Sequence, residues 1–144
     1  SSLLAQAVIG TRFKMTGPHG YFVFRSSDRP AIFVATGTGI APFAALARSG
    51  VRGHLVLHGV RHQRDLYYAS LIRSTSHRYV ACLSEDPRSV DGFFNGRVTD
   101  YLATRLERGL YDFYVCGRED MIRDVTWLVD DHFSGSRVYN EIFY

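Results

Sequence analysis

The chain has 144 residues and a formal net charge of +3, and 46% of its residues are hydrophobic while 22% are charged. These values fit one folded globular domain and exclude intrinsic disorder. No apolar run approaches the ~20 residues that a membrane-spanning helix requires, so we expect no membrane span.

The distribution of basic residues and cysteines argues against several further classes. All basic residues except Lys14 are arginines, and they are scattered without the cluster that a nucleic-acid-binding arm would show. The two cysteines make neither a disulfide framework nor a four-ligand metal site. The first ten residues have no basic leader before their apolar residues, unlike a signal peptide. We therefore expect a soluble cytoplasmic protein without a metal site.

The first thirty residues differ from the rest of the chain. Residues 10–24, GTRFKMTGPHGYFVF, predict a strand, a GPHG turn and a second strand, with no pairing partner in the segments that follow. We expect residues 1–29 to be the end of a preceding β domain and residues 30–144 to form the main domain. The alternative is a β extension that caps the edge of the sheet.

Beyond residue 30 the chain alternates between two kinds of segment. Short apolar or β-branched runs bounded by turn residues predict five strands, at 31–35, 54–59, 78–83, 112–117 and 137–142. Segments whose apolar residues recur every three or four positions predict helices at 40–48, 65–73, 98–106 and 119–133. Because such alternation requires crossover connections, it predicts a doubly wound α/β fold: a five-stranded, mostly parallel sheet with helices on both faces.

The turn after the first predicted strand has the features of an anion-binding site. Gly37 and Gly39 permit backbone conformations and close approaches that a Cβ would block. Pro42 falls in the first helical turn, where its missing N–H costs nothing. Free N–H groups and the positive end of the helix dipole would therefore face a ligand, and we expect that ligand to be anionic.

The predicted topology places a second segment beside this turn. In doubly wound sheets, ligands bind at the carboxyl ends of the strands, where the winding reverses. If the first and fourth predicted strands are neighbours, Thr36–Gly39 and Cys116–Gly117 meet across that crevice. Neither of the common phosphate-binding motifs fits the turn. Pro42 stands at the third glycine of G-x-G-x-x-G, and no Gly-Lys-Ser/Thr follows.

Four segments resemble the pyridine-nucleotide domain of the ferredoxin–NADP reductase superfamily. They are ATGTGIAPF (35–43), LHGVRHQRDLYY (57–68), YVCGREDMIRDV (114–125) and YNEIFY (139–144), and their order and spacing also agree. LLAQAVIGTRFKMTGPHGYFVF (3–24) resembles the last part of that family's flavin-binding barrel. The barrel's arginine–aromatic–Ser/Thr motif is absent from this chain, so the resemblance implies that FAD is bound mainly by another domain.

The resemblance assigns roles to two groups of residues in the first and third of these motifs. The pyrophosphate and nicotinamide side of NAD(P)H would be bound by Thr36, Gly37, Thr38, Gly39, Ile40 and Pro42. Cys116 would lie beside the nicotinamide C4 and position the hydride for flavin N5, and it would not act as a nucleophile. Gly117 would permit close approach of the cofactor. Met121 also matches the motif, but we expect its side chain to pack in the core. Without the motif, Cys116 would be interpreted as a small buried core residue.

The end of the chain supplies the remaining residues of the implied site. Glu141 matches a glutamate that supports the nicotinamide site, although by itself it would read as an exposed strand carboxylate. Phe143 or Tyr144 matches the terminal aromatic residue that stacks on the flavin ring. The sequence leaves the choice between these two aromatics open.

Charges near the expected adenosine ribose give conflicting indications about cofactor choice. Glu85 and Asp86 follow Ser84, where NADP-preferring relatives have Ser-Arg, and carboxylates would repel a 2′-phosphate. Arg61 and Arg97 match arginines that some NADP-dependent members use for this phosphate. We expect a slight preference for NADH over NADPH.

The resemblance implies an oxidoreductase that accepts hydride from NAD(P)H and passes it to FAD, followed by one-electron transfer to a ferredoxin, an iron–sulfur domain or a similar acceptor. In such a protein the cofactors carry the redox chemistry and the protein aligns them. Two alternatives stay open. One is a nucleotide-binding electron-transfer or sensing subunit without reductase activity, and the other is an unrelated doubly wound domain with a different small ligand.

Overall fold

The computed structural model describes residues 2–17, 19–85 and 92–143. Its strands are β1 (Ala31–Thr36), β2 (Leu55–Val60), β3 (Arg78–Leu83), β4 (Phe93–Asn95), β5 (Asp112–Gly117) and β6 (Arg137–Ile142). Its α-helices are α1 (Ser2–Ala5), α2 (Ala41–Arg48), α3 (Ala69–Thr75), α4 (Val98–Arg105) and α5 (Glu119–His132), and two 3-10 turns are η1 (Gly37–Ile40) and η2 (Gln63–Asp65).

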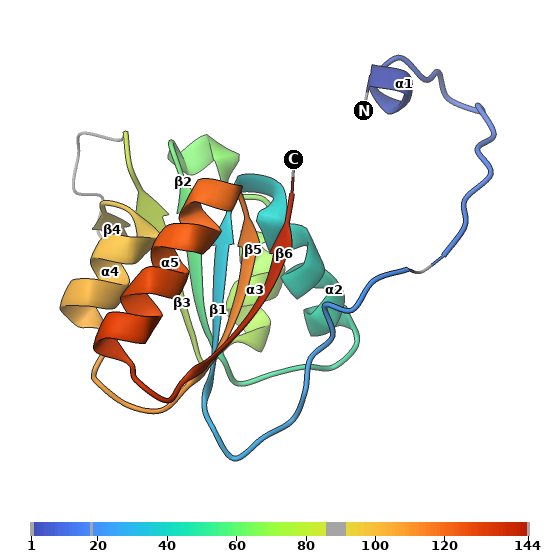
Figure 1. Ribbon diagram of the computed structural model, residues 1–144. Helices are drawn as coiled ribbons and strands as arrows, with labels where there is room; N and C mark the ends of the chain where they lie inside the picture. The colour runs from blue at the N-terminus through green and yellow to red at the C-terminus, as the bar shows by residue number, and fades with distance from the viewer. Residues whose placement is uncertain (1, 18, 86–91, 144) are drawn as a thin grey trace.

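The strands form one parallel sheet in the order β4-β3-β2-β1-β5-β6 (Figure 1). This confirms the doubly wound α/β fold, with six strands in place of the expected five. The additional strand, β4, has only three residues, too few to show the periodicity by which a strand is recognised in a sequence. The winding reverses beside β1, because β2 lies on one side of it and β5 on the other.

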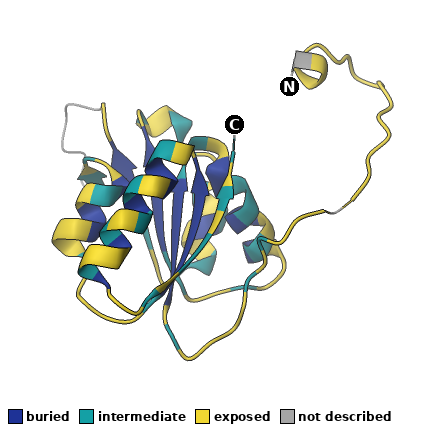
Figure 2. Cartoon of the chain, viewed as in Figure 1, coloured by how far each residue is buried: buried dark blue, intermediate teal, exposed yellow. Residues whose placement is uncertain are grey.

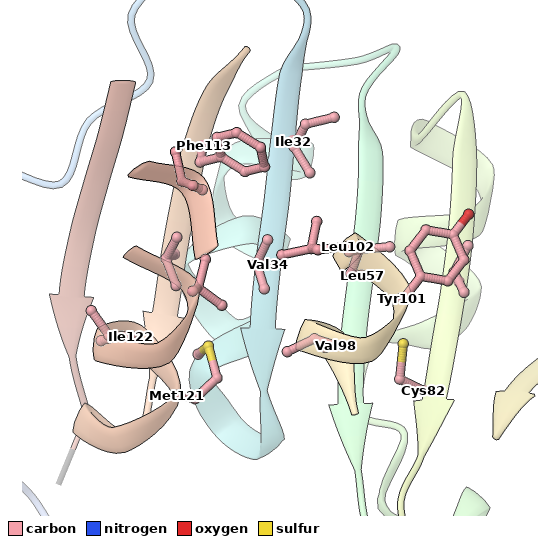
Figure 3. Packing of buried hydrophobic residues seen from close by; sticks show 14 of the residues in the cluster. Ile32, Val34, Leu57, Cys82, Val98, Tyr101, Leu102, Phe113, Met121 and Ile122 are labelled. Atoms are coloured by element: carbon pink, nitrogen blue, oxygen red, sulfur yellow. The ribbon is translucent and has the colours of Figure 1, made fainter. Parts of the chain in front are cut away.

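Two apolar layers flank the sheet. Alternate strand residues pack against α4 and α5 on one face, including Val34, Leu57 and Phe113 (Figure 3). The intervening strand residues pack against α2 and α3 on the other face, including Phe33 and Tyr114. The central strands are therefore buried on both sides (Figure 2). This explains why they appear in the sequence as nearly continuous apolar runs.

The strands expected within residues 10–24 are not formed. No strand occurs in residues 2–17 or 19–30, and residues 2–17 extend away from the α/β body (Figure 1). A two-stranded hairpin is marginal without a third strand, and no strand among the described residues pairs with this segment. The expected β character of this segment is therefore wrong for the chain described here.

Residues 22–29 instead pack against the α/β body. The rings of Phe22 and Phe24 contact Tyr114 with centroid distances of 6.0 and 5.6 Å. The hydroxyl of Ser27 donates a hydrogen bond of 2.5 Å to the buried carboxylate of Asp112. This strap ties the entry of the chain to the amino end of β5, at the edge opposite the strand ends where ligands bind in such folds.

The helix expected over residues 65–73 begins later in the structure. Gln63–Asp65 form the 3-10 turn η2, and Tyr68 adopts a left-handed conformation with φ of 57° before α3 starts at Ala69. The other expected helices agree with α2, α4 and α5 to within a few residues. Because L-residues with side chains rarely adopt positive φ, this interruption is not visible in the pattern of apolar residues.

Candidate functional site

The turn after β1 and the end of β5 are in direct contact. Ala35 pairs with Cys116 across the two strands. A Cβ added to Gly39 would lie 2.7 Å from the carbonyl carbon of Cys116 and 2.8 Å from the Cα of Gly117, and it would overlap the Cys116 oxygen. The structure thus brings Thr36–Gly39 and Cys116–Gly117 together, as the predicted strand order required.

Thr36 and Gly117 complete this contact. The side chain of Thr36 is close enough to Gly117 that a Cβ there would overlap its Oγ1. The N–H of Arg118 also donates to the Thr36 hydroxyl at 3.4 Å. Gly117 has a φ of +146°, and Met121 packs behind it in the apolar cluster under α5 (Figure 3). Met121 is therefore a core residue in this chain.

The turn itself combines an open backbone with a buried support. Nothing lies within 4 Å of a Cβ placed on Gly37, whose φ is +52°, and the side chain of Thr38 is exposed. Ile40, by contrast, is fully buried, so only its backbone can face a ligand. Pro42 lies in the first turn of α2, as expected. A large group can therefore approach the main chain at residues 37–38 without meeting side chains.

Cys116 is buried in the apolar cluster of the α2 face. Burial, and secondarily the negative charge of Glu141, raise the pKa of its thiol to about 12. Glu141 is its partner across the β5–β6 pairing. A thiol with this pKa stays neutral near pH 7, which agrees with the expectation that Cys116 is not a nucleophile.

Of the two terminal aromatic candidates, the structure places Phe143 beside this site. Its N–H donates to the carbonyl of Gly117 at 2.9 Å, and its ring packs against the cluster that contains Cys116. Tyr144 lies outside the described residues. The carboxylate, the thiol and an aromatic ring are thus gathered around the end of β5.

Arg61 and Glu85 lie at the carboxyl ends of neighbouring strands and form an ion pair. Val60 pairs with Leu83, and the Nε of Arg61 is 3.5 Å from Oε1 of Glu85. The imidazole of His62, which the sequence analysis did not single out, is 3.7 Å from the same carboxylate. The two residues that pointed to opposite cofactor preferences are therefore partners in one exposed pair.

Ser84 and Arg97 flank this pair with different roles. The N–H of Ser84 donates to the carbonyl of Val60 at 3.1 Å, which continues the sheet pairing past the strand ends. The N–H of Arg97 donates to Asp100 at 2.7 Å and begins α4, and its position follows β4, the neighbour of β3. Asp86 lies outside the described residues.

His58 on β2 is a fully buried polar residue that was not among the predicted site residues. Its Nε2 is 3.0 Å from the carbonyl oxygen of Gly37, and its Nδ1 is 3.1 Å from the hydroxyl of Tyr79. Burial lowers the pKa of this imidazole to about 4, although its bond to Gly37 acts in the opposite direction. In the sequence, His58 stands out as a histidine within an otherwise apolar strand segment, but this pattern does not indicate which residues it bonds to.

Comparison with known proteins identifies the family. The profile of the oxidoreductase NAD-binding domain matches residues 33–126, well over half of the chain. The chain belongs to this family. The resemblance to the ferredoxin–NADP reductase superfamily is thereby confirmed. The relatives that match this chain include proteins named as electron transfer components.

Two curated relatives illustrate this. The chain is 31% identical over 137 residues to the toluate 1,2-dioxygenase electron transfer component of Pseudomonas putida, covering 88% of this chain and 40% of that protein. It is 29% identical over 150 residues to the anthranilate 1,2-dioxygenase electron transfer component of Acinetobacter baylyi, covering 94% and 43%. This NAD-binding domain thus spans less than half the length of these curated relatives.

Solved structures agree with the fold. The Amycolatopsis cytochrome P450 reductase GcoB superimposes with a TM-score of 0.69 at 29% identity, covering 88% of this chain and 42% of that one. The ferredoxin reductase in carbazole 1,9a-dioxygenase gives a TM-score of 0.70 at 22% identity, covering 89% and 42%, and supports the fold alone. Within residues 2–17, 19–85 and 92–143 there is neither a helix able to cross a membrane nor a group of three potential metal ligands.

Proposed function

We propose that this NAD-binding domain binds NAD(P)H at the carboxyl ends of its strands and delivers hydride to FAD held mainly by a separate domain. The electrons would then pass singly to a ferredoxin, an iron–sulfur domain or a similar acceptor. The observation that carries the proposal is the contact between the Gly37–Ile40 turn and the Cys116–Gly117 strand end, in a chain of this family. The names of the two curated relatives support the same reading.

The described residues fit a dinucleotide. The uncovered backbone at Gly37 and Thr38 would bind the pyrophosphate through N–H groups, because the first N–H groups of a helical turn lack intrahelical partners. The neutral Cys116 would line the nicotinamide pocket, Glu141 would support it, and Phe143 would meet the flavin. Bound NAD(P)H would supply the hydride and bound FAD would accept it. The protein's contribution is positioning.

We also propose a preference for NADH, resting on the state of Glu85. Its carboxylate already contacts Arg61 and His62, so a 2′-phosphate would have to displace it from Arg61 and would face its negative charge. A free ribose diol could instead donate hydrogen bonds to it. Arg97 lies one strand further along and is the remaining candidate for a phosphate contact.

Residues 1–29 fit the end of a flavin-binding barrel, and we extend the proposal to them. Several apolar side chains of this segment are strongly exposed: Leu3, Leu4, Val8, Ile9, Met15 and Tyr21. Exposed apolar surface of this kind is typical of a contact face. A flavin domain of the same polypeptide would cover it. We also propose that the protein operates in the cytoplasm.

Anaerobic mixing of the full-length protein with NADH or NADPH tests the proposal, with reduction followed as loss of flavin absorbance. Cys116→Ala should slow flavin reduction by about ten- to a hundredfold, since small misplacements of reacting groups have effects of this size. Cys82→Ala is the matched control, because Cys82 is also fully buried but lies in the opposite core cluster. Nucleotide binding without any flavin reduction would instead favour a sensing subunit, and no binding at all would refute the proposal.

A further inference from the structure

The imidazole of His58 links the strand next to β1 with the turn that follows β1. In the sheet register His58 lies between Ala35 and Ala81, in a fully buried position. A polar ring is unfavourable in such a position unless its nitrogens are hydrogen-bonded, and here both of them are. Its Nε2 reaches out of the sheet to the carbonyl of Gly37, within the turn that contacts Cys116.

The bond from His58 to Gly37, together with the 3-10 turn η1, fixes which way the next peptide group points. In a trans peptide the C=O and the following N–H point in opposite directions. With the Gly37 carbonyl directed toward the buried His58, the N–H of Thr38 is directed away from the core, toward the side where Thr38 is exposed. Gly37 has a φ of +52°. Because glycine has no Cβ, the Gly37 backbone itself does little to prevent the peptide from turning to the opposite orientation. His58 therefore stabilises the peptide orientation that the turn η1 adopts.

Tyr79 determines which nitrogen of His58 carries the proton. The Gly37 carbonyl can only accept, so Nε2 must donate and Nδ1 must accept from the Tyr79 hydroxyl. Burial raises the pKa of Tyr79 to about 12, which keeps this hydroxyl protonated as a donor. Loss of the hydroxyl would leave Nδ1 free to take the proton, and Nε2 would then present a lone pair to the Gly37 carbonyl.

We propose that His58 and Tyr79 are positioning residues that hold the Thr38 N–H toward the pyrophosphate of the bound dinucleotide. This inference rests on the proposed function. It concerns affinity for the pyrophosphate and makes no claim on the hydride step. The two side chains come from β2 and β3, so the support of the binding turn extends across two neighbouring strands.

Calorimetric titration of the chain with ADP-ribose tests the inference, since this probe carries the pyrophosphate and adenosine but no nicotinamide. His58→Phe should raise its Kd about tenfold, the effect of one lost hydrogen bond with an unsatisfied partner. His58→Gln, which can present an N–H near the Nε2 position, should restore most of the affinity. Tyr79→Phe should weaken binding in the wild-type background but not in His58→Phe, because its effect passes through the imidazole.

A control and a second readout separate this role from general stabilisation. His54→Phe changes a histidine just before β2, at the other end of the strand, whose ring makes tilted contacts with Phe24 and Phe33, and it should leave the Kd unchanged. Nitrogen-15 NMR of the wild-type chain should show His58 protonated at Nε2 near pH 7, and Tyr79→Phe should disturb that signal even if His58→Phe fails to fold.

The outcomes distinguish this inference from the function on which it rests. Wild-type affinity for ADP-ribose in folded His58→Phe, or an Nδ1-protonated ring in the wild type, would overturn the inference while leaving NAD(P)H binding intact. A wild-type chain that binds neither NAD(P)H nor ADP-ribose would refute the proposed function and this inference together. A tenfold loss that His58→Gln does not recover would indicate packing rather than hydrogen bonding, and would also overturn it.

Discussion

Replacing Gly39 by alanine should separate the two strand ends that form the proposed nucleotide site. The new Cβ would lie 2.7 Å from the carbonyl carbon of Cys116, whereas ordinary contact begins at 3.4 Å. The atoms that it meets all belong to the backbone of Cys116 and Gly117, so no side chain can rotate away. The Cys116 oxygen lies closer still, so the turn and the end of β5 would have to move apart by at least about 0.7 Å, and this displacement would fall on the site itself.

The cost of this displacement can be compared with that of a neighbouring glycine. Overpacking a well-packed interior typically costs about 1–3 kcal/mol, and we expect Gly39→Ala to lose about 2–3 kcal/mol of unfolding free energy because only backbone can yield. At Gly37 a Cβ would meet nothing within 4 Å, but the φ of +52° strains any L side chain. Gly37→Ala should therefore lose only about 1 kcal/mol.

Urea unfolding monitored by circular dichroism measures both losses, and titration with ADP-ribose measures the site. We expect Gly39→Ala to bind at least about tenfold more weakly than the wild type. Equal destabilisation by the two variants would mean that backbone conformation, and not the contact with β5, determines the loss of stability at both positions. Wild-type stability in Gly39→Ala would show that the turn and the end of β5 do not touch, and the proposed site would lose its basis.

Two further measurements concern charge. Burial lowers the pKa of His58 from 6.5 to about 4, so between these pH values the unfolded chain binds a proton that the folded chain does not. The free energy of unfolding should therefore fall as the pH falls through this window, by up to about 3 kcal/mol more in the wild type than in His58→Gln. A difference in unfolding free energy between the two proteins that stays constant from pH 7 to 4 would contradict this. Glu85→Arg should raise the ratio of kcat/KM for NADPH to that for NADH, and an unchanged ratio would place the adenosine ribose elsewhere.

The sequence predicted the central sheet well because burial on both faces leaves a simple signature. The predicted bounds of β3, β5 and β6 coincide with those observed. The failures have equally physical causes. β4 is too short to carry a pattern, and residues 10–24 have the composition of a hairpin but pair with no strand among the described residues. A local pattern cannot report whether a partner exists.

The candidate site shows the same division. The glycines of the turn and the Cys116–Gly117 strand end could be named from the sequence because their chemistry is local and the strand order brings them together. His58 could not be assigned a role, because each of its two partners lies 21 residues away along the chain and becomes a neighbour only in the assembled sheet. A buried polar residue has a meaning only when its hydrogen-bond partners are known.

The two restraints on the turn act from opposite sides of β1. Gly39 presses against the backbone of Cys116 on β5, and the carbonyl of Gly37 is held by His58 on β2. A site that binds its ligand through backbone N–H groups has no side chain that can adjust to a displaced peptide, so its affinity depends on how firmly the peptide planes are fixed. The glycines let a ligand approach the backbone of the turn but give the turn little rigidity. The rigidity therefore has to come from the neighbouring strands. Because the winding reverses at β1, this rigidity comes from β2 on one side of the turn and from the remote strand β5 on the other.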